Sequence, residues 1–220
     1  MPVTLAELRG QVQARLAEPI STTTWFTPEV VNSYINDAIT QVFLRIVEAN
    51  PDFFGLKNTQ ITTIQGVQEY DLPADIFEIR HVGLSLGYPT EVRMTELDYS
   101  TRMMYPVKGR PMSFYWVRDY SSATTRIGFV PMPDADGYQI KVWYTPRPRK
   151  LVNDADTMDL PDETAQIVVP LATAYALASD KQLAQNEVNE YERKMVQYLS
   201  FVTRGRGSGP QYVNYPYPLW

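Results

Sequence analysis

The sequence contains few of the side chains that carry catalysis or bind metals. It has no cysteine and a single histidine, His81. The lack of cysteine excludes disulfide scaffolds, thiolate zinc sites, iron–sulfur clusters and thiol nucleophiles, because each of them needs sulfur. One imidazole cannot form a multi-histidine metal site. His81 lies between Arg80 and Val82 in a predicted strand, and we interpret it as a structural or surface histidine.

Acidic residues gather in two places, and loop or turn chemistry explains both. Four aspartates could offer oxygen atoms to calcium, but the glycine of the EF-hand pattern is absent and apolar residues interrupt the run. These four are Asp154, Asp156, Asp159 and Asp162. Asp134 and Asp136 precede Gly137 with the spacing of a hairpin turn. The sequence therefore predicts no catalytic residue, no metal site and no cofactor.

Basic residues are densest in the segment 146–151, which contains Arg147, Arg149 and Lys150. Three charges fall short of a nucleic-acid footprint, so we interpret the segment as a solvated connection between domains. The stretch 205–209, Gly-Arg-Gly-Ser-Gly, is only superficially like a phosphate loop, because it follows a predicted helix and runs into a proline. We interpret it as a flexible hinge.

The composition is that of a globular chain. The 220 residues are 44% hydrophobic and 20% charged, which is enough to bury a core. No apolar run approaches the roughly 20 residues of a membrane helix, and the N-terminus does not read as a signal peptide. A formal charge of −5 disfavours a protein that grips nucleic acid, since phosphate binding needs a basic surface. A protein that lets DNA pass is still allowed.

Helical periodicity is present at both ends of the chain. A first helix is predicted from Thr4, with apolar residues at intervals of three and four, and Pro19 ends it. Thr27-Pro28-Glu29 then provides an N-cap hydroxyl, a proline at the first helical position and an early acid, so a second helix should begin there and reach Asn50. Trp25 and Phe26 should act as its hydrophobic staple.

Two further helices are predicted near the C-terminus. One contains Pro170 within its apolar stripe, and this proline should kink the helix or mark a tightened first turn. The other carries an apolar stripe from Val188 to Val202 and ends before Gly205.

The middle of the chain has the character of strands. Short stretches rich in Ile, Val, Thr and Tyr are separated by Gly and Pro. The expected strands are 60–64, 67–72, 76–86, 91–94, 112–118, 126–130 and 138–144. No helix long enough for a crossover connects them, which predicts an antiparallel sandwich or barrel-like sheet.

These elements predict an α+β fold. Residues 1–57 and 151–204 should form one helical bundle, because their apolar stripes can cover one another. An antiparallel β domain, residues 58–150, is inserted between them. Residues 205–220 form an extended tail.

The tail is aromatic where disordered tails are normally charged. Residues 210–220 hold three tyrosines, three prolines and a tryptophan, with no charged side chain. Such a segment favours an extended, polyproline-like backbone and offers large contact areas at low entropic cost. We expect it to bind another chain through Tyr212, Tyr215, Tyr217 and Trp220.

The order of several short motifs resembles a known family. Each motif has a local explanation, such as a turn that ends a strand, but their succession over residues 25–203 is specific. In order, they are Trp25, Thr27-Pro28-Glu29, Tyr34-Ile35-Asn36-Asp37-Ala38, 69–75 (EYDLPAD), Gly109-Arg110-Pro111, 128–134 (GFVPMPD), 142–148 (VWYTPRP) and Asp159-Leu160-Pro161. The sequence is similar to the head-to-tail adaptor, or connector, proteins of tailed bacteriophages, in particular the class that includes tail tubular protein A.

This resemblance implies a structural protein of the virion and not an enzyme. It implies a homo-oligomeric ring, commonly of twelve copies, that lies under the portal at the head–tail junction, after assembly in the host cytoplasm. The C-terminal extension would reach the portal protein. The next tail component, a nozzle or a tail tube or terminator protein, would bind below. DNA would pass through the channel without sequence-specific binding, and no membrane is involved.

Two other function classes are compatible with parts of the pattern. A β-sandwich carbohydrate-binding or adhesion module of a phage tail would need exposed aromatic rings, and Tyr115, Trp116, Trp143 and Tyr144 lie in predicted strands whose alternation buries about half of them. A hydrolase would need two acids with displaced pKa values in one pocket, and no motif indicates such a pair.

Overall fold

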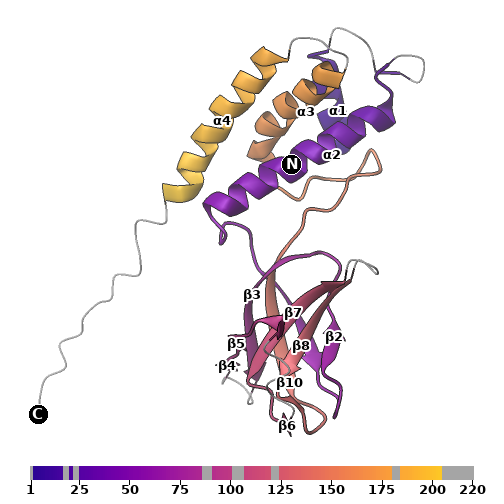
Figure 1. Ribbon diagram of the computed structural model, residues 1–220. Helices are drawn as coiled ribbons and strands as arrows, with labels where there is room; N and C mark the ends of the chain where they lie inside the picture. The colour runs from indigo at the N-terminus through magenta and orange to yellow at the C-terminus, as the bar shows by residue number, and fades with distance from the viewer. Residues whose placement is uncertain are drawn as a thin grey trace, which may run out of the picture. The chain divides into compact units, whose positions relative to one another are not determined.

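The computed structural model describes residues 2–16, 20–21, 25–85, 91–100, 107–119, 124–179 and 184–204. The chain divides into two compact units. One consists of the residues up to Phe53 together with those from Pro148 onward, and we call it the helical unit. The other, Phe54–Arg147, is the β unit. The predicted α+β class, with helices flanking an inserted sheet region, is confirmed (Figure 1).

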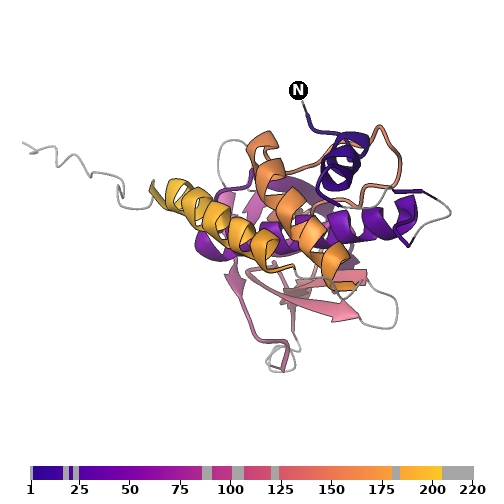
Figure 2. The same cartoon turned by 90° about the horizontal axis from the view of Figure 1, so that it is seen from above.

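The helical unit contains four α-helices within the described residues. They are α1 (Leu5–Gln13), α2 (Pro28–Ala49), α3 (Ala165–Ser179) and α4 (Gln185–Thr203), and the 3₁₀ turn η2 (Asp162–Thr164) precedes α3. Helix α3 packs against α1, α2 and α4 (Figure 2). Most of its residues are buried, including Pro170, as expected for a helix covered on several sides. The turn η2 begins three residues after Asp159 and leads directly into α3.

The predicted helix starts are confirmed by their caps. Thr4 and Glu7 form a capping box at α1, and the Thr27 hydroxyl accepts a hydrogen bond from the backbone N–H of Val30. Phe26 is buried as a staple residue should be, but Trp25 is exposed, so the staple prediction was half wrong.

Two details of the helices differ from the predictions. Helix α1 ends at Gln13, although Leu16 is still buried, because the N–H of Leu16 bonds to the carbonyls of both Val12 and Gln13 and the last turn tightens. The buried face of α2 begins at Val31 and not at Val30. Pro19 lies outside the described residues.

Asn36, in the middle of α2, holds the chain where it returns from the β unit. Its side-chain amide donates to the carbonyl of Leu151 over 3.0 Å, and its side-chain oxygen accepts from the N–H of Leu151 over 2.8 Å. The Leu151 side chain is 2% exposed. A single amide thus satisfies both polar groups of a buried backbone segment.

The returning segment also completes the start of α1. The backbone N–H groups of Leu5 and Ala6 donate to the carbonyls of Asp156 and Asp154. These donors have no partner within their own helix. The segment 151–156 therefore joins α1 to α2.

The β unit consists of two four-stranded sheets and one two-stranded pair. The first sheet has the order β1 (Lys57–Thr62), β10 (Gln139–Pro146), β3 (Ile76–Ser85), β4 (Glu91–Arg93). The second has the order β2 (Glu69–Asp71), β8 (Thr124–Val130), β7 (Ser113–Asp119), β5 (Thr95–Glu96), and the pair is β6 (Lys108–Gly109) with β9 (Met132–Pro133). Over the described residues the sheets stay open, so the barrel-like alternative was wrong and the sandwich-like one stands.

The expectation of purely antiparallel pairing was wrong at two short places. Strand β5 pairs with β7 in parallel, and β6 pairs with β9 in parallel. Met132–Pro133, which lies between the expected strands 126–130 and 138–144, forms β9. Pairs of two residues have no alternation that a sequence could reveal. The longer ladders, β1–β10, β10–β3 and β7–β8, are antiparallel as predicted.

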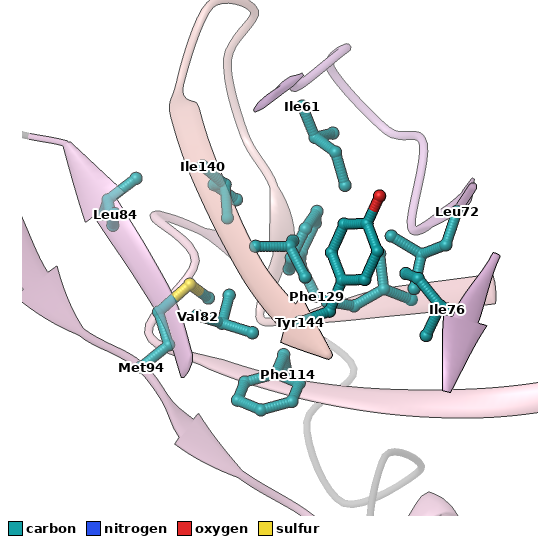
Figure 3. Packing of buried hydrophobic residues seen from close by; sticks show 12 residues of the cluster. Ile61, Leu72, Ile76, Val82, Leu84, Met94, Phe114, Phe129, Ile140 and Tyr144 are labelled. Carbon is teal, nitrogen blue, oxygen red and sulfur yellow. The ribbon is translucent and has the colours of Figure 1, made fainter. Parts of the chain in front are cut away.

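The two sheets share one hydrophobic core. Val82, Ile140 and Val142 come from the first sheet, and Phe114, Ile127 and Phe129 come from the second. Figure 3 shows Val82, Phe114, Phe129 and Ile140 of this core, with the Tyr144 ring in the middle of the cluster and Met94 beside Val82. The β unit therefore buries an apolar core of its own, as a sandwich requires.

Gly128 is required by a close approach across β7 and β8. Tyr115 lies directly opposite it, and a Cβ at residue 128 would lie 2.1 Å from Cζ of the tyrosine. The Tyr115 ring is 1% exposed and packs edge-on against Tyr99, while its hydroxyl donates to Glu69. The glycine of the GFVPMPD motif thus makes room for a buried ring.

We predict that Asn36→Asp destabilises the helical unit. The carboxylate cannot donate to the Leu151 carbonyl and would place a charge beside a buried backbone, so the free energy of unfolding should fall by about 2 kcal/mol. Asn189→Asp makes the same change on an exposed face of α4 and should cost less than about 0.5 kcal/mol. Urea denaturation measures both changes in the free energy of unfolding. Equal changes would contradict the role of Asn36 in holding the backbone of Leu151.

We predict that Gly128→Ala destabilises the β unit by about 1–3 kcal/mol, because the new methyl group overlaps the Tyr115 ring. Gly55→Ala is the matched control in the same unit, since nothing lies within 4 Å of a Cβ there. Thermal unfolding followed by circular dichroism would compare the two. An unchanged midpoint for Gly128→Ala would show that the ring does not occupy this position in solution.

Candidate docking surface

His81 is held by a carboxylate from the neighbouring strand. Its Nε2 lies 3.1 Å from Oε1 of Glu91, which reaches across Gly83. A side chain at residue 83 would collide with that carboxylate. The contact agrees with the structural interpretation of His81.

The aspartates of the segment 154–159 stabilise their own loop. Asp154 forms a salt bridge with Arg9 at 2.8 Å. Asp156 accepts the backbone N–H groups of Val152 and Asn153, and these hydrogen bonds lower its pKa. Asp159 binds both the backbone N–H and the guanidinium of Arg149. The loop role predicted for these residues is confirmed, and Asp162 lies at the start of η2.

The family-like motifs meet in pairs. Asp75, which ends EYDLPAD, accepts hydrogen bonds from Lys57 and from the Tyr144 hydroxyl, and its carbonyl accepts the N–H of Arg147. Tyr144 and Arg147 belong to VWYTPRP. Burial alone would raise the pKa of Asp75, but the bonds from Lys57 and Tyr144 outweigh it and the pKa lies below its usual value.

The basic segment divides between the two units. Arg147 donates to the carbonyl of Ile76 and lies 5.9 Å from the centre of the Phe77 ring, whereas Arg149 binds Asp159 and Lys150 is exposed. Burial, followed by the charge of Arg118, lowers the pKa of Arg147. Two of the three side chains therefore make local structural contacts, which the sequence did not predict.

The acids of the predicted hairpin turn also have local partners. Asp134 accepts the hydroxyl of Tyr138, and Asp136 accepts the backbone N–H of Gln65. Gly137 has a φ of 90°, a conformation that favours glycine. The turn interpretation is confirmed.

The aromatic residues of the strands do not gather on an exposed face. Tyr115 and Tyr144 are buried, and Trp143 is half-buried. Trp116 is 40% exposed, but its indole N–H donates to Glu96. The predicted burial of about half of these rings is confirmed. Two of the four rings are thus closed to a sugar ligand.

The described residues form several surface pockets but no cluster of metal-ligating side chains. Three surface pockets in these ranges each contain a single acid, Asp37, Glu96 or Glu163. No group of three or more His, Asp or Glu side chains is placed to hold a metal ion there. None of the described helices combines the length and the apolar character needed to cross a membrane.

The described residues do contain an apolar groove of about 480 Å³ along the second half of α4. Phe53, Tyr198 and Phe201 form its aromatic side. The Tyr198 ring lies 6.1 Å from Phe53 in an edge-on arrangement and 6.2 Å from Phe201. Phe201 is 63% exposed, so the groove opens to solvent at that ring. This groove is the candidate docking surface of the helical unit.

The sequence analysis did not predict the groove. Phe201 lies three residues after Tyr198 and next to the stripe residue Val202, so a second apolar row on α4 was a signal that could have been read. Phe53 comes from the end of α2, and sequence alone does not show that it meets α4.

Ion pairs hold the first half of α4 in place. Arg15 binds Glu187 and Glu190 at 2.7 and 2.8 Å, and Lys194 also binds Glu190. Hydrogen bonds from Arg15 and then from Lys194 lower the pKa of Glu190 to about 2. Arg45 of α2 binds Glu192 in a more exposed pair. These contacts fix α4 to α1 and α2.

The four predicted portal-binding residues, Tyr212, Tyr215, Tyr217 and Trp220, lie outside the described residues, as does the glycine-rich stretch 205–209. Their role stays a prediction.

We predict that Glu190→Gln removes much of the pH dependence of the helical unit. The folded pKa of about 2 lies below the unfolded value of 4.5, so the stabilisation is complete above about pH 4.5 and is lost as the pH falls toward 2. Because the pair is partly solvated, we expect a contribution of only about 1 kcal/mol at pH 7.

Denaturation at pH 7 and pH 3 tests this prediction. The loss of stability between the two pH values should be smaller in Glu190→Gln than in the unaltered protein. Glu192→Gln, which breaks the more exposed pair with Arg45, should change this loss less. An unaltered pH dependence in Glu190→Gln would contradict the conclusion that the lowered pKa of Glu190 stabilises the folded helical unit.

Comparison with known proteins places this arrangement in a family. The family described as SU10 adaptor protein matches residues 3–213, which is nearly the whole chain. No curated protein matches the sequence. The match covers both helical segments and the inserted β unit, and it agrees with the resemblance to phage adaptors found in the sequence motifs. The chain belongs to the SU10 adaptor protein family, a family of phage head-to-tail adaptors, and is a structural component of the virion.

Proposed function

We propose that this protein forms a ring of twelve copies that joins the portal of a tailed phage to the next tail component and surrounds the DNA channel. The observation that carries the proposal is the family match over residues 3–213. The local contacts of the titratable groups support it, because His81, Asp75 and Asp154–Asp159 serve structure in this chain. We also propose that the protein belongs with the tail tubular protein A class within the adaptors.

The tail is the proposed portal anchor. Residues 210–220 offer Tyr212, Tyr215, Tyr217 and Trp220 without a single charged side chain. Tyrosine and tryptophan contribute strongly to interfaces, because they bury large areas with few rotatable bonds. A groove on the portal can take such an extended segment at low cost in desolvation.

The distribution of charge supports a DNA channel lined by helices. The ranges 1–53 and 148–220 carry 15 acidic and 10 basic residues, whereas 54–147 carries 10 of each. The net charge of −5 thus belongs to the helical unit and its tail. An acidic wall repels phosphates and lets DNA slide without binding. Assembly would take place in the host cytoplasm.

We predict that deletion of residues 205–220 leaves a folded protein that no longer binds portal. The buried core residues of both units lie at or before Val202, so the truncated protein should still fold, with an unchanged circular dichroism spectrum. Binding to purified portal, followed by co-sedimentation and electron microscopy of the mixture, should show rings only with the full chain. Retained binding would refute the anchor role.

Point variants separate the aromatic side chains from the tail as a whole. Replacing Tyr212, Tyr215, Tyr217 and Trp220 together by serine should abolish portal binding, because each ring buried at an interface contributes on the order of 1–2 kcal/mol. The control replaces the polar tail residues Gln211 and Asn214 by serine and should bind normally. A stable, tight dimer of the isolated protein in sedimentation would contradict a cyclic, head-to-tail interface.

A further inference from the structure

The groove on α4 has the chemistry of a binding site for an extended, proline-containing segment. Its three aromatic rings are inclined to one another. The ring planes of Phe53 and Tyr198 differ by 78°, and those of Tyr198 and Phe201 differ by 45°. The amides of Gln166 and Gln197 lie beside the rings and can donate to backbone carbonyls. Aromatic-lined grooves with such donors are how proteins bind polyproline-like chains.

The cations of the groove favour aromatic residues in the bound segment. Arg193 lines the groove and makes no salt bridge within the part of the chain that the structure describes. Its guanidinium is available to lie over the face of a tyrosine or tryptophan ring. Glu163 is the only acid among the groove's residues, so a segment without acids or bases meets no strong repulsion.

One segment of this chain has the matching chemistry. Residues 210–220 alternate prolines with aromatic rings and carry no charge. Arg204 lies three residues beyond the groove residue Phe201, and only residues 205–209 separate it from the segment in the sequence. The same chain therefore supplies both the aromatic groove and a segment that fits it.

The tether is long enough for this segment to turn back. The glycine-rich connection of five residues, 205–209, has a mean reach of roughly 12 Å. The stretch of α4 from Phe201 back to Arg193 covers about 12 Å at the rise of an α-helix. Gly205, Gly207 and Gly209 allow the chain to reverse. A tether this short gives a millimolar effective concentration.

We propose that in the free protein residues 210–220 lie in the groove of Phe53, Tyr198 and Phe201 on the same chain. In this position the groove would cover the aromatic rings of residues 210–220, which would otherwise be exposed to water. The groove would therefore compete with the portal for this segment. The docking does not depend on the portal role. Release of the segment to the portal rests on the proposed function.

Limited digestion of the full chain with chymotrypsin tests the docking. Chymotrypsin cleaves after aromatic residues but not before proline, so Tyr212–Val213 is the susceptible bond of the tail. Mass spectrometry would follow release of residues 213–220. Relative to a free peptide of residues 210–220, cleavage should be about tenfold slower, as expected for a groove of roughly 0.1 mM affinity at millimolar effective concentration.

Two variants of equal exposure make the test specific. Phe201→Ser removes a ring of the groove and should raise the rate toward that of the free peptide. Val196→Ser is also on α4 and its side chain is also 63% exposed, but it does not line the groove, so its rate should equal that of the unaltered chain. Neither side chain is in the core, so both variants should fold.

The outcomes separate this proposal from the portal role. Equal cleavage of the chain and the peptide would overturn the docking, and so would protection that increases with protein concentration, because the tail would then bind another copy. Phe201→Ser should bind portal as tightly as the unaltered chain or up to about tenfold more tightly, because residues 210–220 need not first leave the groove. Protection without portal binding supports the docking and refutes only the portal role.

Discussion

The structure depends on how the chain re-enters the helical unit after the β unit has interrupted it. The backbone of α2 has already used its own donors and acceptors, so it cannot pair with a segment that arrives from 115 residues further on. Asn36 solves this problem, because an amide carries a donor and an acceptor on two separate atoms and can meet a backbone C=O and N–H at the same time. With Leu151 held in both directions, the following residues offer their carbonyls to the first N–H groups of α1. One partly buried amide therefore brings two distant parts of the chain into a common core.

This anchoring explains why the inserted β unit can be built independently. Its core contains side chains from both of its own sheets, and its entrance and exit are tied together by Asp75, which binds Lys57, Tyr144 and the backbone of Arg147. Two of the segments that carry the family resemblance, EYDLPAD and VWYTPRP, make this closure. Hydrogen bonding near the ends of the β unit thus accounts for Asp75 and Tyr144.

The sequence predicted the elements whose signals are local and repeated. Thr27-Pro28 marked the start of α2, and the alternating strands 113–119 and 139–146 were found within one or two residues. Strands β5, β6 and β9 could not be predicted, because two residues have no period and their pairing depends on distant partners. The same limit applies to the groove. Phe53 and Phe201 are 148 residues apart in the chain, and only the packing of α4 against the end of α2 brings them to one site.

In a structural adaptor, function depends on the surfaces that folding leaves uncovered. The ion pairs of Arg15 and Arg45 hold the first half of α4, and buried Met195 and Val202 hold the second half. The exposed apolar side chains Val196 and Phe201 lie in that second half, and the tail begins one residue after Arg204. Water penalises such apolar exposure, and apolar surface beside an aromatic groove marks a site for contacts with another segment or chain. A helix fixed at one end and apolar at the other, next to an uncharged aromatic segment, fits a protein whose contacts change as a virion is assembled.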